Sequence, residues 1–596
     1  MVEEKLKTQR TQGLTVASLD FVRVCLSLLC VLCASVAHCF SLDREAFTFT
    51  SYDLNVQVEP EQHRLGVRGK ITLRNDSSTP QKIAVLQVSS SLAWRSIKAG
   101  DKAVQFVTQP YTSDVDHTGA LSEAIVTLPQ PVATKGTVDL NIGYEGVILL
   151  DTTRLTRIGT PEDVAKSTDW DQIGANFTAV RGAGYVVWYP IATEAANLSE
   201  GNSFSEVLGK WKMRETGSNM HLRVTLAREG DHIPQVLFGG ISCSILTIEQ
   251  MGLGQALEAE CASQSLRLDV PALVIVDYQV MEKAGIEVRY FAGHDTAATS
   301  FADAAEKVAP LITEWFGAQR ERAKTAELPD PNAAPFESGA LLLTPLAGPD
   351  PKLAGLAAVH QLTHASFLSF RPWIEEGLAH FAQALYLEQQ KGRQAALDYM
   401  GLHRSAFSEA EKQATLPRSE GEASRSLVHT TDEGLYRSKA MYVWWMLRDM
   451  IGDAALKKAF ASYRPEEDKD PSYMPRLIAA QTQRDLGWFF DDWVYHDRGL
   501  PDFKVESAFS RKATANQFLL TITVDNLGGV GAEVPLVVKF TGGEVRKRLE
   551  VRAKSKATIR VETAGAPLEI VVNDGSMPES DMTNNVFKVE AASDSR

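Results

Sequence analysis

Two histidines four residues apart are the side chains in this sequence best placed to do chemistry. His360 and His364 lie in the apolar segment LAGLAAVHQLTHASF, which predicts a helix from about residue 353 to residue 370. Residues i and i+4 lie on the same face of a helix, so the two imidazoles point the same way. Such a pair can supply two of the protein ligands of a zinc ion (Zn2+).

The next predicted helix can supply the third ligand. It opens with Pro372 and the segment WIEEGLA, in which Glu376 follows His364 by twelve residues. A carboxylate there can turn back onto the two histidines. H-x-x-x-H followed by W-x-x-E-G-x-A is typical of zinc metallopeptidases. The histidine pair alone would also fit two hydrogen-bonded core residues, but the downstream motif favours a metal site made of His360, His364 and Glu376.

One position departs from that motif, because Gln361 stands where a metallopeptidase has glutamate. Zinc lowers the pKa of its bound water to about 7, and the glutamate accepts the proton of that water. We expect residue 361 to face the open coordination position of the metal. An amide there can hydrogen-bond water but cannot accept a proton at neutral pH. The sequence therefore predicts a retained zinc site with weakened or lost peptide hydrolysis.

Two neighbouring residues could partly replace the missing base. Glu375 adjoins Glu376 but should point about 100° away from it around the helix. His380 lies one turn beyond Glu376 and could orient a water, or it could be a core or surface histidine.

The composition excludes some function classes. The chain has 596 residues, is 44% hydrophobic and 23% charged, and carries a net charge of −14. This balance is typical of globular proteins, and the length predicts about three or four domains. The negative charge and the absence of a long Lys/Arg run argue against nucleic acid as a partner.

The first 40 residues are predicted to be a signal peptide. Basic residues precede an apolar run from Val24 to Ala37 that ends in small side chains. That run is short for a membrane span, which needs about 20 residues, although an uncleaved anchor stays possible. We therefore expect an exported protein, periplasmic or extracellular, which touches a membrane only through this segment. Beyond it the chain has two cysteines, Cys243 and Cys261, which could form a disulfide or stay as buried thiols.

The remaining chain predicts a multidomain α+β protein. Alternating patterns such as Tyr52–Val58 indicate an N-terminal, mostly antiparallel β domain over residues 45–285. Residues 286–500 are helix-rich and hold the zinc motif, with one buried strand expected at 338–344 and a polar, helix-poor stretch at 405–433. Residues 503–592 return to period two and predict a compact β-sandwich.

This order of domains resembles the membrane alanine aminopeptidase family of gluzincins, over about residues 47 to 590. The motif from His360 to Ala379 carries the resemblance, and softer matches are Trp188-Tyr189-Pro190, the segment from Tyr436 to Asp453, and Asp485 to Trp493. The resemblance implies a thermolysin-like zinc domain, an Ig-like C-terminal sandwich, and a peptide or protein as substrate or ligand. It also implies His360, His364 and Glu376 as the zinc ligands, although 11 residues separate His364 from Glu376 where the family typically has 18.

The resemblance also places two functional residues. The family's G-A-M-E-N strand, whose acidic residue holds the free amino group of the substrate, falls on Gly339-Ala340-Leu341-Leu342-Leu343. Leu342 at the acidic position cannot pair with an ammonium, so the usual exopeptidase specificity is not expected. The tyrosine that stabilises the oxyanion falls near Tyr436, one residue out of register, and Arg437 competes for the same place.

Three interpretations of function follow. The first is an aminopeptidase-like zinc protein with weakened or lost hydrolysis that binds peptides in the former cleft. The second is an active zinc metallopeptidase that uses another base. The third is a metal-free interaction module, in which the histidines are core residues.

Overall fold

The computed structural model describes residues 42–200, 203–228, 233–251, 254–268, 270–347, 351–414, 426–430, 432–514 and 517–589. The predicted signal peptide lies outside these residues. Contacts divide the chain into two units, Met1–Ala46 and Phe47–Arg596, so the predicted division of the second unit into three domains stays a prediction. None of the helices in the described segments is both long and apolar enough to cross a bilayer.

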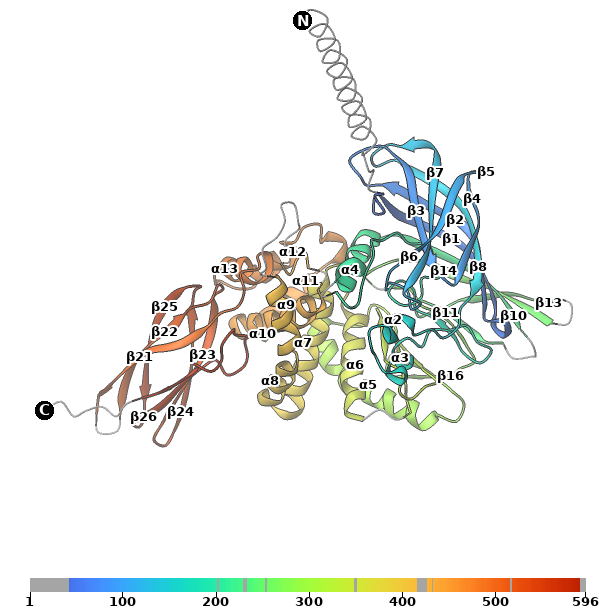
Figure 1. Cartoon of the computed structure of the whole chain (residues 1–596). Helices are drawn as coiled ribbons and strands as arrows, with labels where there is room; N and C mark the ends of the chain where they lie inside the picture. The colour runs from blue at the N-terminus through green and yellow to red at the C-terminus, as the bar shows by residue number, and fades with distance from the viewer. Residues whose placement is uncertain are drawn as a thin grey trace, which may run out of the picture. The chain divides into compact units, whose positions relative to one another are not determined.

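An eight-stranded sheet organises the N-terminal part of the second unit (Figure 1). Strand β1 (Phe47–Glu59) follows the predicted alternation, with Tyr52, Leu54, Val56 and Val58 all buried. Every pairing in this sheet is antiparallel except that of β1 with β10 (Asn219–Arg228), which is parallel. The other strands are β13 (Ser244–Met251), β14 (Gly254–Ser265), β2 (Arg64–Asn75), β8 (Thr137–Val147), β4 (Leu92–Ala99) and β5 (Lys102–Ala103). A disulfide joins Cys243 to Cys261 of β14, which decides between the two states expected for these thiols.

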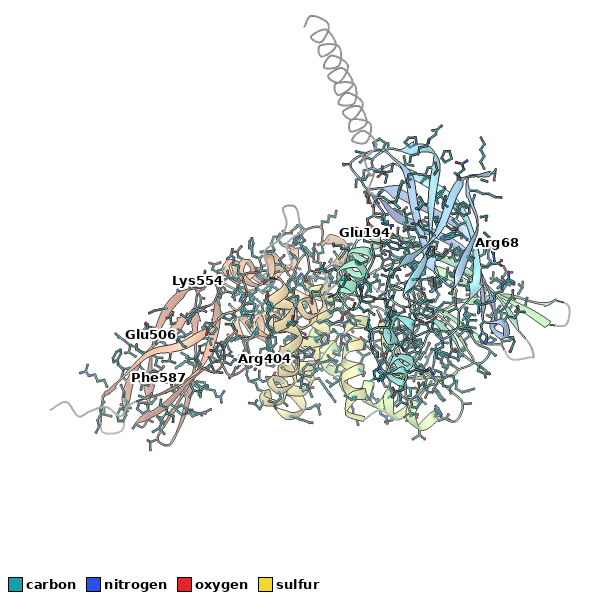
Figure 2. All side chains as sticks on the ribbon, in the orientation of Figure 1. Arg68, Glu194, Arg404, Glu506, Lys554 and Phe587 are labelled. Carbon is teal, nitrogen blue, oxygen red and sulfur yellow. A yellow bond between two sulfur atoms is a disulfide. The ribbon has the colours of Figure 1, made fainter. Side chains whose placement is uncertain are left out.

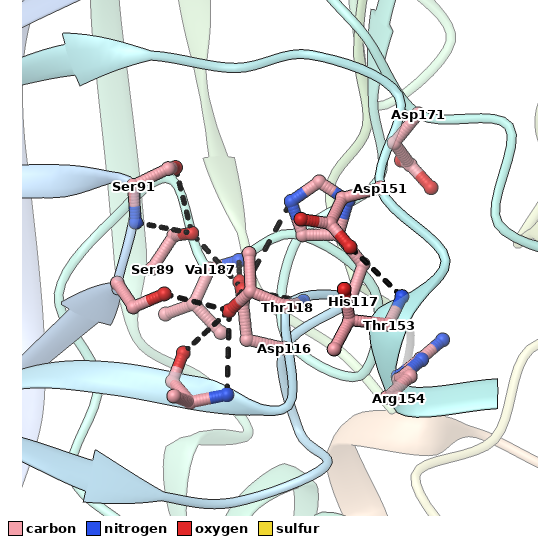
Figure 3. Close-up of polar contacts among 12 residues, drawn as sticks. Ser89, Ser91, Asp116, His117, Thr118, Asp151, Thr153, Arg154, Asp171 and Val187 are labelled. Atoms are coloured by element: carbon pink, nitrogen blue, oxygen red, sulfur yellow. Dashed lines mark hydrogen bonds and ion pairs between the residues drawn. The ribbon is translucent and has the colours of Figure 1, made fainter. Parts of the chain in front are cut away.

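Two smaller sheets complete this part of the chain. One has the order β3 (Gln81–Ser89), β7 (Ala120–Val132), β6 (Gln105–Thr112), and the other has the order β12 (Ile241–Ser242), β11 (Gln235–Phe238), β15 (Leu273–Val276), β9 (Thr178–Val180). The buried carboxylate of Asp116 joins strand β3 to the segment that follows β9 (Figure 3). It accepts hydrogen bonds from Ser89 Oγ at 3.0 Å and from the backbone N–H of Val187 at 2.8 Å. This fixes the segment that leads into Trp188-Tyr189-Pro190.

A five-stranded mixed sheet begins at Gln279 and supports the histidine helix. Its order is β16 (Gln279–Lys283), β17 (Ile286–Tyr290), β18 (Ala323–Glu327), β20 (Leu341–Thr344), β19 (Phe336–Ser338). The central strands β17, β18 and β20 run parallel, and the two edge strands are antiparallel to their neighbours. Helix α5 (Asp295–Phe316) connects β17 to β18 and packs beside α6 (Pro351–Ser366). One face of α5, which includes Phe301, Val308 and Trp315, is buried.

The single strand expected at 338–344 is in fact two strands. Gly339 has a φ of +57°, a conformation that side chains with a Cβ rarely adopt, and it turns the chain between β19 and β20. Glu337 of the edge strand therefore pairs with Leu342 of the neighbouring strand. This hairpin changes which side chain reaches the histidines.

Helices α7 (Pro372–Lys391), α8 (Arg393–Leu402) and α9 (Arg404–Ala414) follow α6, and α6 packs against α7 (Figure 1). Because α9 occupies residues 404–414, the expectation of a helix-poor stretch from 405 was wrong there. After it come a π-helix, η2 (Gly434–Lys439), and α10 (Ala440–Ile451). The remaining elements are α11 (Asp453–Ser462), α12 (Tyr473–Ala479), α13 (Gly487–Phe490) and a second π-helix, η4 (Asp491–Tyr495).

Two facing sheets form the C-terminal part, as the alternating pattern predicted. One has the order β21 (Phe503–Lys512), β22 (Phe518–Asn526), β25 (Ser555–Thr563), and the other has the order β24 (Gly543–Val551), β23 (Ala532–Phe540), β26 (Pro567–Val572), β27 (Val586–Lys588). Their inner side chains, such as Leu520, Ile522 and Val538, are fully buried. Figure 2 shows the side chains and labels Glu506, Lys554 and Phe587 on this part.

Candidate metal centre

The helix predicted from sequence brings the two histidines together. His360 and His364 lie on α6 with their Nε2 atoms 3.0 Å apart, and both residues are buried. The helix is apolar on its other sides because it packs against α5, the sheet and α7. The two imidazoles therefore lie on one face of α6 with their Nε2 atoms side by side, as their spacing predicted.

Two carboxylates meet the imidazoles. Glu376 of α7 places one oxygen 3.8 Å from His360 Nε2 and the other 3.8 Å from His364 Nε2. Glu337 of β19 lies closer, with an oxygen 2.9 Å from His360 Nε2. Among the described residues, Glu337, His360 and His364 form a group whose ligand atoms all lie within 4.8 Å of one another.

These atoms fit a zinc ion. Tetrahedral zinc with bonds of about 2.0–2.2 Å holds its ligand atoms about 3.3–3.5 Å apart. The observed separations of 2.9–3.8 Å lie around that value, and the ligands are two nitrogens and carboxylate oxygens, a donor set that zinc accepts. Either glutamate could complete the set with the two histidines. The assignment of Glu376 as the third ligand stays a prediction.

Glu375 orients His364 rather than replacing the missing base. Its Oε1 accepts a hydrogen bond from His364 Nδ1 at 3.3 Å, and its Oε2 accepts one from the backbone N–H of Ser369. A carboxylate behind the metal-facing nitrogen is the usual partner of a zinc-bound histidine. Burial alone would lower the pKa of His364, but Glu375 and Glu376 outweigh it and raise that pKa to about 10. Metal binding would therefore release a proton from this ring.

The acidic group of the edge strand is Glu337, not the position occupied by Leu342. Leu342 is fully buried in the sheet, as an apolar residue of a central strand should be. Its partner Glu337 points into the site, where burial disfavours its charge but His360 and His364 hold the pKa of the carboxyl below its usual range. Leu342 itself offers no carboxylate, as the sequence indicated, but Glu337 on the paired edge strand presents one to His360.

Gln361 does not face the open coordination position that the sequence led us to expect. Its Nε2 donates to the carbonyls of Lys324, at 2.6 Å, and Ala340, at 3.1 Å, and its Oε1 accepts from Thr325 Oγ1 at 3.0 Å. The side chain is 1% exposed. It ties α6 to the sheet with two donated hydrogen bonds, which a carboxylate could not make.

The π-helix η2 carries both Tyr436 and Arg437, the two side chains expected near the site. Tyr436 reaches Glu433 through its hydroxyl at 3.2 Å, while Arg437 donates to Glu376 Oε2 at 3.1 Å. Burial opposes the charge of Glu376, but Arg437 and the two imidazoles hold the pKa of its carboxyl well below its usual range. Arg437 thus holds one oxygen of a carboxylate that faces both imidazoles.

A cleft of about 610 Å³ opens over these residues. One wall is polar and holds the histidines, the glutamates, Tyr436 and Arg437. The rest of the lining comes largely from the N-terminal part. It includes an apolar wall, made by Leu155 of α2 (Thr153–Thr156) and by Phe204, Leu208 and Met213 of α4 (Ser203–Glu215), and also the cations Arg154, Lys212 and Arg267.

No protein-family model matches the sequence, and no curated protein is similar to it at a significant level. Solved structures similar to this chain include an M1 zinc metallopeptidase from Deinococcus radiodurans, with 16% identity, a TM-score of 0.47, and 77% of this chain and 96% of that chain covered. A variant of that enzyme bound to the substrate Tyr-Ser-Ala matches with 16% identity, a TM-score of 0.46 and the same coverage. A two-domain M1 zinc metallopeptidase variant bound to L-arginine matches with 16% identity, a TM-score of 0.42, and 73% and 91% covered.

Sequence reasoning missed Glu337 and the roles of Glu375 and Arg437. The signal for Glu337 was the glycine that follows it by two residues, since a glycine inside an apolar run often marks a turn or bulge. Nothing local to the sequence pairs Arg437 with Glu376, because they are 61 residues apart and meet only across α7 and η2.

Proposed function

We propose that this protein is an exported zinc protein of the aminopeptidase-like type that binds peptide amino termini in its cleft and hydrolyses peptides weakly or not at all. The observation that carries the proposal is the cluster of His360, His364, Glu337 and Glu376 at the floor of the cleft. When bound, zinc would polarise a peptide carbonyl and acidify its bound water.

The chain's own residues divide the work of binding. His360, His364 and Glu376 hold the metal, with Glu375 orienting His364 and Arg437 orienting Glu376. Glu337 on the edge strand is placed to accept the ammonium of a peptide amino terminus. Tyr436 lies on the same polar wall, within reach of a developing oxyanion. The peptide side chain beside the ammonium would lie against the apolar wall.

Weak hydrolysis follows from residue 361. A positioned general base is typically worth about 10²- to 10⁴-fold in rate. Gln361 cannot accept a proton, and its hydrogen bonds to the sheet keep it away from the cleft.

A second candidate function, an active peptidase with another base, is favoured by the position of Glu337. Its carboxylate lies 2.9 Å from His360 Nε2, so it is close enough to the metal position to take a proton from a bound water.

Export is supported by the disulfide between Cys243 and Cys261, because such bonds persist in oxidising compartments. The basic and apolar start of the sequence agrees with export. No nucleic acid is proposed as a partner.

Metal analysis and peptide turnover of the purified protein test the proposal. We expect one zinc per chain and slow release of the amino-terminal residue from Leu-Gly-Gly. The Gln361→Glu variant should be no faster than wild type, because residue 361 lies against the sheet and not in the cleft. Metal-free protein with no zinc affinity would mean an interaction module. Equal, fast turnover by wild type and variant would establish the active peptidase instead, and Glu337→Gln would then abolish it.

A further inference from the structure

His380 is a third imidazole in the cleft, and the metal cluster does not use it. It lies on α7 one turn after Glu376 and lines the cleft. Its ring meets the ring of His360 edge-on, with the centroids 5.0 Å apart. The sequence left its role open between a water-orienting residue and a passive one.

A chain of hydrogen bonds fixes which nitrogen of His380 carries hydrogen. Gln383 Nε2 donates to the carbonyl of Leu356 at 3.0 Å, which orients the amide and leaves Gln383 Oε1 as an acceptor. Tyr399 uses its only hydroxyl hydrogen to donate to that oxygen at 2.5 Å. The hydroxyl oxygen of Tyr399 can therefore only accept from His380 Nδ1, which lies 3.3 Å away.

The other ring nitrogen is left as an acceptor. With the hydrogen on Nδ1, a neutral His380 has a free lone pair on Nε2. Nε2 has no hydrogen-bond partner among the residues that the structure describes, and the residue borders the cleft beside His360. An acceptor fixed in this way can hold a water or a peptide N–H in one orientation.

From this geometry we propose that His380 is a positioning residue, whose Nε2 accepts a hydrogen bond from the water or peptide N–H that lies beside His360. Tyr399 and Gln383 act behind it by holding its tautomer. The inference rests on the proposed function, since it supplies to the same cleft an acceptor that Gln361 does not. It also gives a reason for the partly buried Gln383–Tyr399 pair between α7 and α8.

The tautomer is measured first, on the full zinc-loaded chain labelled with ¹⁵N-histidine. The signals of His380 in long-range ¹H–¹⁵N spectra are assigned as those that disappear in His380→Gln. They should show hydrogen on Nδ1 and none on Nε2. In Tyr399→Phe the acceptor behind Nδ1 is gone, so the Nε2–H form should appear. Adding Leu-Gly-Gly should shift the Nε2 resonance of wild type. Hydrogen on Nε2 in wild type, or no shift with the peptide, overturns the proposal.

Turnover of Leu-Gly-Gly gives the second readout. His380→Ala should lower kcat by about 10- to 100-fold with KM changed less than about threefold and the zinc content intact. Tyr399→Phe should lower kcat less. His403→Ala is the matched control, because the centroids of the His403 and His380 rings are also 5.0 Å apart but His403 does not border the cleft. The kcat of this variant should stay unchanged. Unchanged kcat in His380→Ala overturns the proposal. If wild type shows no turnover, which agrees with the proposed function, the spectra alone decide the role of His380, whereas a loss of zinc binding would contradict the proposed function itself.

Discussion

At the scale of single residues, the site depends on which carboxylate joins the two imidazoles. Glu376 is equidistant from His360 and His364. Glu337 lies 2.9 Å from His360 Nε2 and within 4.8 Å of the ligand atom of His364, and its side chain is 33% exposed. The third ligand must reach the point that both Nε2 atoms can contact. This favours Glu376, whose oxygens are at the same distance from the two rings. Glu337 is then free for the substrate.

We therefore expect Glu376→Ala to weaken zinc binding by more than about 100-fold, since losing residues behind the ligands already costs about 10- to 100-fold. Glu337→Ala should weaken it by less than tenfold. Competition with a zinc-sensitive dye measures both affinities. The reverse order would make Glu337 the third ligand and leave Glu376 as the partner of Arg437.

Gln361 is a second residue that matters individually, because its amide holds α6 to the sheet. Gln361→Glu in the metal-free protein should lower the free energy of unfolding by about 3 kcal/mol, because it buries a carboxylate against the carbonyls of Lys324 and Ala340. Urea unfolding measures the change. Gln394→Glu is the control, because Gln394 is exposed on α8, and its effect should stay within about 0.5 kcal/mol. Equal effects in the two variants would show that the amide of Gln361 does not hold α6 to the sheet.

At the scale of elements, the π-helix η2 decides which side chains reach the metal cluster. Its last residue, Lys439, is buried and lies 2.5 Å from Glu411 of α9 and 3.5 Å from Asp497. This ion cluster holds η2 against α9 and the segment after η4, so Tyr436 and Arg437 are presented from a fixed base.

Lys439→Met should destabilise the protein by about 3–5 kcal/mol, since it leaves two carboxylates buried without their cation. Thermal or urea unfolding at pH 8 measures the loss. Lys166→Met, which removes an exposed pair with Glu162, should cost no more than about 0.5 kcal/mol. A small effect of Lys439→Met would mean that α9 and η2 are held by apolar packing alone.

Helix α4 carries a second element-scale prediction, on pH. Glu215 at its end is 1% exposed, and burial raises the pKa of its carboxyl from 4.5 to about 7. The folded protein thus keeps this proton up to about pH 7, whereas the unfolded chain releases it near 4.5. Stability should therefore fall as the pH rises from about 4.5 to 7 and then level off. In Glu215→Gln this part of the pH dependence should vanish, and an unchanged stability curve would contradict the assignment.

At the scale of the whole molecule, the disulfide between Cys243 and Cys261 closes a short loop within the N-terminal sheet. The cysteines are 18 residues apart, so the chain-entropy model predicts a loss of about 3 kcal/mol in the Cys243→Ala, Cys261→Ala double variant. Urea unfolding with and without reductant measures it. Reductant should lower the stability of wild type but leave the double variant unchanged.

Local pattern was enough to predict some elements of this chain. Strand β1, the strands of the C-terminal part, the helices α6 and α7, and the meeting of His360 with His364 follow from residue periodicity, because a helix or strand imposes its spacing on nearby side chains. Two predictions of elements were wrong, each because a local feature of the sequence was misjudged. A glycine turned an apolar run into two strands at 339, and polar residues from 404 formed a helix that the pattern did not favour.

The sequence by itself therefore determined the histidine pair, the nearby glutamates and an amide rather than a carboxylate at position 361, since each depends on residue identity or on spacing within one helix. Only the tertiary structure decided that Glu337 enters the site, that Gln361 turns to the sheet, that Arg437 holds Glu376, and that Tyr399 sets the tautomer of His380. These contacts join residues of different elements, and no periodicity within one element encodes where another element will pack.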